Sequence, residues 1–240
     1  MVNKLFARTL AFISPQHCIL CDQHCPGPLD LCAPCQAELP YLQAPLCQHC
    51  ALPLANEGEL SCARCLKKLP SFSTLVAGWR YQHPIDELIT GFKYQTKLSH
   101  GRVLGQLLGA RIRQLYGHSP QPGLLIPTPL HWRRWWQRGY NQSELLAQQL
   151  SKQLNIPIHR GLRRQLHTPK QQGLNAAQRQ RNLKHAFKVN KQQTLLGQCV
   201  AVVDDVVTTT ATAEAMSRCL LAAGAAEVHI WCLARTPIDL

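Results

Sequence analysis

The sequence lacks any apolar stretch that approaches the ~20 residues a membrane-spanning helix needs. The apolar side chains near its start form a core too short for a signal peptide, and Lys4 and Arg8 lie among them. Residues 1–16 instead predict an amphipathic helix. We therefore expect a cytoplasmic protein that is not integral to a membrane.

Acidic side chains are also scarce: 13 Asp and Glu stand against 26 Lys and Arg, a formal net charge of +13 in 240 residues. Residues 1–75 carry five charges of each sign, so the whole excess lies in residues 76–240. Between residues 131 and 188, twelve basic residues face one acid, Glu144. Such a segment can be a solvated face only, but it also favours polyanionic partners, either nucleic acid or phosphorylated ligands.

Cysteine is absent from residues 66–198, whereas nine of the 12 cysteines fall within residues 18–65. Eight of the nine form four C-x-x-C pairs. In a reduced chain this spacing favours metal binding over disulfides, and two pairs supply the four thiolates of a closed tetrahedral zinc site. The predicted ligands of two structural zinc ions are Cys18, Cys21, Cys32, Cys35, Cys47, Cys50, Cys62 and Cys65.

We expect the two zinc sites to be sequential, with the first four of these cysteines on one ion and the last four on the other. An interleaved arrangement stays open on spacing alone, and Cys25 or a nearby histidine (His17, His24 or His49) could replace a ligand. Zinc supplies folding energy to a module of ~60 residues that has few large apolar side chains. Cys199, Cys219 and Cys232 predict ordinary buried thiols.

The composition changes after the Lys67–Pro70 linker, which predicts two domains, residues 1–70 and 71–240. In the second domain, apolar segments of strand length alternate with segments of helical periodicity, and residues 160–182 predict a long loop. This alternation predicts an α/β fold with an open, mostly parallel sheet flanked by helices. The expected strands are 74–79, 124–127, 187–189, 199–203 and 227–234, and the expected helices are 84–92, 103–116, 142–154 and 212–222.

The segment 199–212 combines an apolar strand, two adjacent carboxylates and a hydroxyl-rich turn that opens a helix. Backbone N–H groups, hydroxyls and the helix dipole can hold a phosphate, and the carboxylates can accept hydrogen bonds from ribose hydroxyls. Ligands bind at the carboxyl ends of strands in such sheets. The alternative is a buried strand followed by Thr210 or Thr212 as a helix N-cap. The candidate residues are Asp204, Asp205, Thr208, Thr209, Thr210 and Thr212.

A second candidate segment, residues 126–142, combines arginines with tryptophans after a strand that ends at prolines. Arginine binds phosphate in a bidentate manner, and an aromatic ring can stack on an unpaired base for ~1–3 kcal/mol. The segment therefore suits a pyrophosphate or single-stranded nucleic acid. The alternative is that the tryptophans pack on the zinc module or on a partner subunit. The residues selected are Trp132, Arg133, Arg134 and Arg138.

The run from Cys199 to Thr212 resembles the phosphoribosyl-pyrophosphate (PRPP) loop of type I phosphoribosyltransferases. The resemblance implies that the acidic pair contacts the ribose hydroxyls and that the threonine-rich turn holds the 5′-phosphate. That family usually has glycine at the position of Thr210. Because glycine permits a positive φ and a close approach of the backbone, a β-branched residue there argues against tight phosphate binding.

Further ordered matches resemble one specific group, the ComF/GntX family, over residues 17–237. They are the cysteine module, Gly91–Tyr94, Pro127 with Pro129 and Leu130, Arg138–Gln142, and the pattern from Thr168 to Phe187. The resemblance implies a double zinc ribbon fused to a phosphoribosyltransferase-like domain. It also implies a role in handling imported DNA, in natural transformation or in the use of DNA as a nutrient.

Two functions are consistent with these residues, and we predict the first, with the second as the alternative. In the first, the basic, tryptophan-rich face engages single-stranded DNA and the PRPP-type site is regulatory or vestigial. In the second, the protein is an active phosphoribosyltransferase in which Mg²⁺ bridges PRPP to water and to Asp204 or Asp205. A third role, a zinc-based adaptor for protein partners of the DNA-uptake machinery, is compatible with either. The balanced charge of residues 1–75 favours protein contacts for that module.

Overall fold

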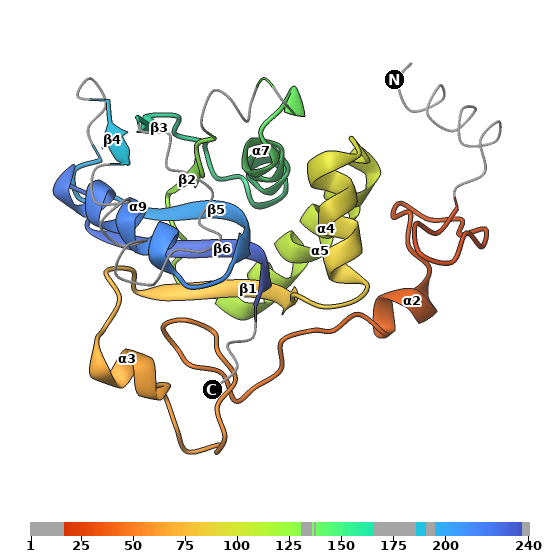
Figure 1. Ribbon diagram of the computed structural model, residues 1–240, viewed down its shortest axis with the longest axis horizontal. Helices are drawn as coiled ribbons and strands as arrows, with labels where there is room; N and C mark the ends of the chain where they lie inside the picture. The colour runs from red at the N-terminus through yellow and green to blue at the C-terminus, as the bar shows by residue number, and fades with distance from the viewer. Residues whose placement is uncertain (1–16, 131–135, 137, 166–185, 191–194, 237–240) are drawn as a thin grey trace.

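The computed structural model describes residues 17–130, 136, 138–165, 186–190 and 195–236. Four of the strands in this part of the chain form one parallel sheet in the order β1-β6-β5-β2 (Figure 1). The expected α/β architecture with an open, parallel sheet is therefore confirmed. The strands are β1 (Thr74–Arg80), β2 (Leu124–Pro127), β5 (Cys199–Val207) and β6 (Glu227–Arg235).

Helices cover both faces of this sheet. Along β5, Ala201 and Val203 pack with the helices of one face, whereas Val200 and Val202 pack with the helix of the other. Because both faces are buried, the central strands are almost continuously apolar rather than alternating. The first face carries α4 (Ile85–Tyr94), α5 (Leu98–Tyr116) and α7 (Gln142–Leu154), and the second carries α9 (Ala211–Ala222).

Helices α5 and α7 approach each other closely because α5 has glycines on the facing side. A Cβ atom on Gly109 would lie 2.0 Å from Gln153 Oε1, and one on Gly105 would lie 2.6 Å from Gln149 Oε1. Helix α7 begins where the sequence predicts, since the side chain of Asn141 accepts a hydrogen bond from the Ser143 N–H. This close packing fixes the start of α7 next to the end of β5.

Three expected elements differ from the structure. Strand β5 continues to Val207 because β6 runs beside it and pairs Val206 with Ala234. The acidic pair therefore lies inside the strand. Helix α5 begins at Leu98 rather than at residue 103. The sequence does not indicate this earlier start, because the first turn is mostly polar and carries no apolar periodicity. The expected loop 160–182 contains β3 (Leu162–Arg164), which pairs antiparallel with β4 (Phe187–Val189). Residues 166–182 of that loop, like the N-terminal helix expected at 1–16, lie outside the described residues.

The cysteine-rich part holds two short helices, α2 (Ala33–Ala37) and α3 (Ala63–Lys67). Figure 1 shows them apart, α2 beside the α4–α5 pair and α3 on the other side of β1. Between them the chain runs antiparallel to β1, where Arg80 N–H donates to Pro40 O at 2.9 Å. This contact covers an edge that would otherwise present unpaired backbone groups. Among the described helices, none is long and apolar enough to cross a membrane.

Candidate zinc centres and phosphate site

The eight paired cysteines form two compact groups of thiols. In each group all four sulfur atoms lie within 4.8 Å of one another. Cys21 Sγ and Cys32 Sγ are 3.7 Å apart, and Cys50 Sγ and Cys62 Sγ are 3.6 Å apart. A tetrahedron with Zn–S bonds of ~2.3 Å has edges of about 3.8 Å, so both groups fit zinc. The groups are Cys18, Cys21, Cys32 and Cys35, then Cys47, Cys50, Cys62 and Cys65, which confirms the sequential arrangement.

Backbone geometry prepares both groups in the same way. Cys32 and Cys62 are the N-caps of α2 and α3, with nearly identical backbone angles, φ −72° and ψ 155° against φ −70° and ψ 159°. Burial opposes ionisation of the Cys18 thiol, but hydrogen bonds from backbone N–H groups outweigh it and lower the pKa of Cys18 to about 6. The same balance lowers the pKa of Cys47 to about 7. The thiolate, the form that zinc binds, is thus favoured at one cysteine of each group, whereas the pKa values of Cys21, Cys35, Cys50 and Cys65 are raised.

The nearby alternative ligands take other roles. Cys25 Sγ donates to Leu29 O at 3.9 Å, and His49 Nδ1 donates to Ser73 O at 3.1 Å. Among the described residues neither side chain, nor His17 or His24, joins a four-thiol group. Four cysteines therefore complete each centre without a substitute ligand.

The acidic pair lies near the carboxyl end of β5 and is held by three different elements. Asp204 Oδ1 accepts hydrogen bonds from the Asp205 N–H at 2.9 Å and from Ser143 Oγ, at the start of α7, at 3.3 Å. Asp205 Oδ1 lies 3.0 Å from Lys93 Nζ, near the end of α4. Both partners of this ion pair are largely buried, with 17% and 15% of their side-chain surfaces exposed.

Burial and neighbouring charges act on the acidic pair and on its partner Lys93. Burial and then the negative charge of Asp205 raise the pKa of Asp204 to about 7. Burial alone would lower the pKa of Lys93, but the adjacent Asp205 carboxylate more than offsets it and holds that pKa above its usual value. The oxygens of both carboxyl groups can accept hydrogen bonds from vicinal hydroxyls.

The threonine-rich turn connects β5 to α9. Thr210 has φ +62°, the left-handed conformation that glycine adopts at low cost. Thr210 stands at the N-cap position of α9, as the alternative interpretation has it, but its hydroxyl donates to Thr209 O at 2.6 Å and makes no capping hydrogen bond. The turn therefore keeps the backbone conformation of a glycine-containing loop although it carries a β-branched residue.

The N–H groups of this turn are available to a ligand. Within the described part of the chain, no acceptor meets the backbone N–H of Thr209, Thr210 or Ala211. The N–H of Thr212, in the first turn of α9, is likewise unpaired there. Together with the helix dipole these donors form an anion-binding arrangement.

Two arginines at the turn were not anticipated from the sequence. Arg64, in α3 of the second zinc group, donates from Nη2 to Thr209 O at 2.6 Å and to Thr210 Oγ1 at 3.4 Å. Arg235, at the end of β6, donates from Nε to Cys50 O at 3.0 Å and from Nη1 to Val207 O at 3.1 Å. Nothing in the sequence signals these contacts, which join segments far apart in the chain. The sequence contains one weak indication of a role for Lys93, which is that Gly91–Tyr94 is among the segments that resemble the ComF/GntX family.

Of the arginine and tryptophan segment, Trp132, Arg133 and Arg134 lie outside the described residues. Arg138 is described, and its guanidinium lies 4.6 Å from the ring centre of Tyr94, which directly follows Lys93. Tyr94 and Trp136 are 66% and 75% exposed. The end of α4 and this segment therefore present exposed aromatic rings together with a cation.

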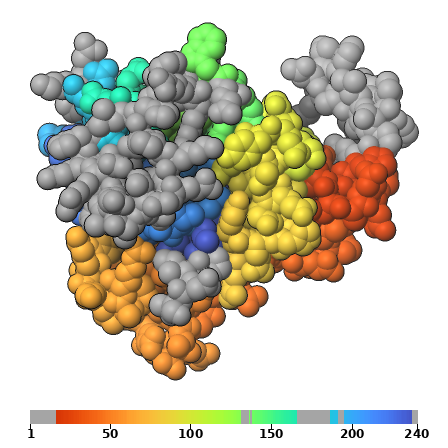
Figure 2. Space-filling view, viewed as in Figure 1, coloured from red at the N-terminus to blue at the C-terminus, as the bar shows by residue number. Residues whose placement is uncertain are grey.

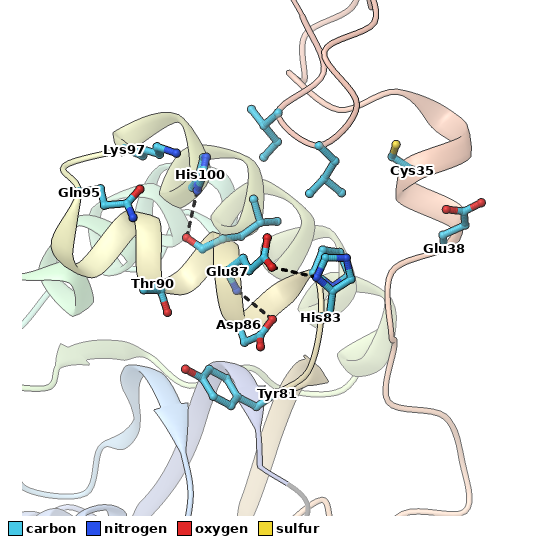
Figure 3. Close-up of a pocket in the computed structure, with 14 residues that line it drawn as sticks. Cys35, Glu38, Tyr81, His83, Asp86, Glu87, Thr90, Gln95, Lys97 and His100 are labelled. Atoms are coloured by element: carbon cyan, nitrogen blue, oxygen red, sulfur yellow. Dashed lines mark hydrogen bonds and ion pairs between the residues drawn. The ribbon is translucent and has the colours of Figure 1, made fainter.

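A separate cleft of about 780 Å³ lies between the first zinc group and α4 (Figure 3). Its rim carries Glu38, Asp86 and Glu87 against one lysine, Lys97, and His83 pairs with Glu87 at 3.2 Å. Figure 3 shows Glu38 and Cys35 facing these residues from α2. This excess of carboxylates repels a phosphate polymer, so the cleft does not extend the candidate anion site.

A third group of side chains lies at the opposite, amino end of the sheet. There Cys199, Glu227 and His229 place their donor atoms within 4.8 Å of one another. His229 Nε2 donates to Glu227 at 2.9 Å, and Trp231 Nε1 donates to Tyr116 OH, which contacts His229 Nδ1. Burial and then Glu227 raise the pKa of Cys199 to about 11, which favours a protonated thiol in this partly buried network.

Sequence comparison places these features among known proteins. A double zinc ribbon domain matches residues 9–66. Competence protein F of Haemophilus influenzae is 39% identical over 222 residues, which cover 88% of this chain and 95% of that protein. DNA utilization protein YhgH of Escherichia coli K12 is 38% identical over 195 residues, 80% of this chain and 84% of that protein. Competence protein ComFC of Bacillus subtilis is 24% identical over 211 residues, 86% of this chain and 84% of that protein.

The solved structures with a partial likeness include phosphoribosyltransferases. Glutamine PRPP amidotransferase of Bacillus subtilis has a TM-score of 0.38 at 19% identity over 55% of this chain and 25% of that chain. A purine phosphoribosyltransferase of Pyrococcus horikoshii has a TM-score of 0.35 at 20% identity over 55% of this chain and 70% of that chain.

Proposed function

Because the chain belongs to the family of competence protein F and the DNA utilization proteins, we propose that it handles imported single-stranded DNA in the cytoplasm. The role would be natural transformation or the use of DNA as a nutrient. Residues 1–70 form the double zinc ribbon in this proposal, and residues 71–240 form a phosphoribosyltransferase-like domain with a PRPP-type phosphate site. The ribbons would also meet protein partners of the DNA-uptake machinery.

The observation that carries the DNA proposal is the surface formed by Trp136, Arg138 and Tyr94. It joins exposed aromatic rings to a cation, the combination that holds single strands through stacking and phosphate contact. Trp136 and Arg138 also belong to the segment 131–188, in which twelve basic residues face one acid. The electrostatic part of such binding weakens steeply as salt is added.

The test is the affinity for a fluorescent single-stranded oligonucleotide at low salt. Replacing Arg133, Arg134 and Arg138 by alanine should weaken binding at least tenfold and should flatten its salt dependence. A matched control replaces three exposed cations elsewhere, Lys67, Lys68 and Arg113, and should change the affinity much less. Equal affinities of the two triple variants would overturn the assignment of this surface.

A second candidate function, an active phosphoribosyltransferase, is favoured by the φ of +62° at Thr210. Thr210 adopts the left-handed conformation that a glycine would adopt there, which supports a phosphate site despite the threonine. Asp204 and Asp205 each have one carboxylate oxygen without a described donor, and these could accept from ribose hydroxyls or meet Mg²⁺ that enters with PRPP. Stabilising the departing pyrophosphate would be the main catalytic contribution.

Calorimetric titration of PRPP with Mg²⁺ tests the phosphate site. Wild-type protein should release or absorb heat, and the Asp204→Asn/Asp205→Asn variant should not. The absence of a signal from both proteins would mean that the sugar-phosphate site is not functional and that the transferase candidate is wrong.

A further inference from the structure

The turn that follows β5 has no cation of its own. Residues 199–217 contain Asp204, Asp205 and Glu214 but neither lysine nor arginine. The first basic residue along the chain is Arg218, which pairs with Glu214 at 2.7 Å. A phosphate bound at the turn would meet a helix dipole worth roughly half a charge and an excess of carboxylates. A tight phosphate site here requires a cation from elsewhere.

The second ribbon, residues 47–65, places such a cation at the turn. Arg64 contacts Thr209 O and Thr210 Oγ1 through one nitrogen, Nη2, and its side chain is exposed. Its guanidinium therefore lies at the edge of the turn, with further N–H donors for a phosphate oxygen. Lys93, which also lies near the site, is already bound to Asp205.

The ribbon is positioned for this contact by two constraints. Arg64 lies between the zinc ligands Cys62 and Cys65 in a helix of five residues, so the metal centre fixes the start of its side chain. Arg235 then links the same centre to the turn, because it donates to Cys50 O on one side and to Val207 O on the other. Its guanidinium is buried and adds positive charge beneath the turn.

We propose that Arg64 is a phosphate-binding residue of the PRPP-type site, so that the second zinc ribbon completes the site of the α/β domain. The inference rests on the proposed sugar-phosphate site and names the group that neutralises the ligand's phosphate. The four cysteines of the second centre, when they hold zinc, would fix α3 and so position Arg64, whereas the first centre does not contact the turn.

The experiment is calorimetric titration of PRPP with Mg²⁺ into full-length variants. Arg64→Ala should weaken binding about tenfold or more, and Arg64→Lys should recover part of the loss. The matched control is Lys67→Ala, which removes the same charge from the same helix and has no hydrogen-bond or ion-pair partner among the described residues. Its affinity should stay within about twofold of wild type.

A salt series separates phosphate binding from simple support of the turn. If Arg64 touches the phosphate, affinity in Arg64→Ala depends less on salt than in wild type. An unchanged salt dependence, or an unchanged affinity, overturns the role of Arg64 even when wild type binds PRPP and the Asp204→Asn/Asp205→Asn variant does not. Failure of wild type to bind PRPP overturns both this inference and the sugar-phosphate site. Each variant should contain two zinc ions per chain. This content would confirm that a weak calorimetric signal is not caused by the unfolding of a zinc ribbon.

Discussion

The first ribbon, residues 18–35, and the second ribbon have the same local design and different surroundings. Each places four thiols within 4.8 Å, and each ends in a five-residue helix with a cysteine N-cap. Cys18 and Cys25 of the first belong to the main core beneath α4 and α5. The thiols of the second ribbon form a small separate core with Leu52. This ribbon contacts the turn after β5 through Arg64.

This difference shows that the spacing of ligands does not determine what a ribbon does. Figure 2 shows the ribbons at separate places on the molecule, the first (red) beside α4 (yellow) and the second (orange) below the blue part of the α/β domain. The first adds apolar surface to a core and lines the acidic cleft. The second contributes a cation to a candidate ligand site. Side chains near the ligands decide what each ribbon contacts. Asp30 of the first ribbon pairs with Arg102, and Arg64 of the second ribbon contacts Thr209.

Removing the ligands of each ribbon in turn has the largest expected effect. Cys18→Ser/Cys21→Ser and Cys62→Ser/Cys65→Ser should each reduce the zinc content from two ions per chain to one, and each ribbon should unfold locally because zinc provides its folding energy. Elemental analysis measures the zinc content. Hydrogen exchange should then accelerate in residues 206–212 only in the second variant. Equal acceleration in both variants would contradict the distinction between the ribbons.

The next largest effect is expected at Arg235, which joins the second ribbon to the turn. Arg235→Met leaves the carbonyls of Cys50, Val207 and Thr208 without this donor in a buried place, and should lower the free energy of unfolding by about 3 kcal/mol. Chemical denaturation measures the change. The control, Arg113→Met, removes an exposed arginine that donates to one carbonyl, Gln153 O, and should cost below ~1 kcal/mol. Equal losses would mean that the link through Arg235 adds no stability.

A smaller, pH-dependent effect is expected where the linker behind the second ribbon meets α9. Glu214 accepts from the Ser71 N–H at 2.7 Å and from Ser71 Oγ at 2.8 Å. Burial alone would raise the pKa of Glu214, but the hydrogen bonds from Ser71 and the charge of Arg218 outweigh it, so the pKa is lowered. A carboxylate with a lowered folded-state pKa stabilises the fold above its unfolded pKa, and this stability is lost as pH falls through the folded value.

Glu214→Gln should therefore destabilise the protein by about 1–2 kcal/mol at pH 7 and by progressively less as pH falls below ~4. Denaturation of both proteins across this pH range is the measurement, and a loss that does not depend on pH would exclude the charge as its cause. Asp30→Asn gives the corresponding comparison for the first ribbon. Because Arg102, the partner of Asp30, is half exposed, that loss should be at most ~1 kcal/mol.

Much of the fold could be predicted because its signals are local. The strand 124–127 and the helix that begins after Asn141 follow from apolar runs and an N-cap, and the structure has them at the same positions. The end of β5 could not be predicted, because Asp204 and Asp205 remain in the ladder only through pairing with β6. The strand Leu162–Arg164 depends in the same way on a partner more than twenty residues away.

The sequence alone determined the two zinc groups, the parallel α/β domain and the acidic pair followed by a threonine-rich turn. These features depend on residue spacing and on short-range periodicity, both of which are visible in the sequence. Only the tertiary structure decided that Lys93 neutralises Asp205, that Thr210 adopts a positive φ, and that Arg64 and Arg235 meet the turn. Contacts of this kind join residues separated by up to 185 positions, and they form only when packing of the apolar core brings those segments together.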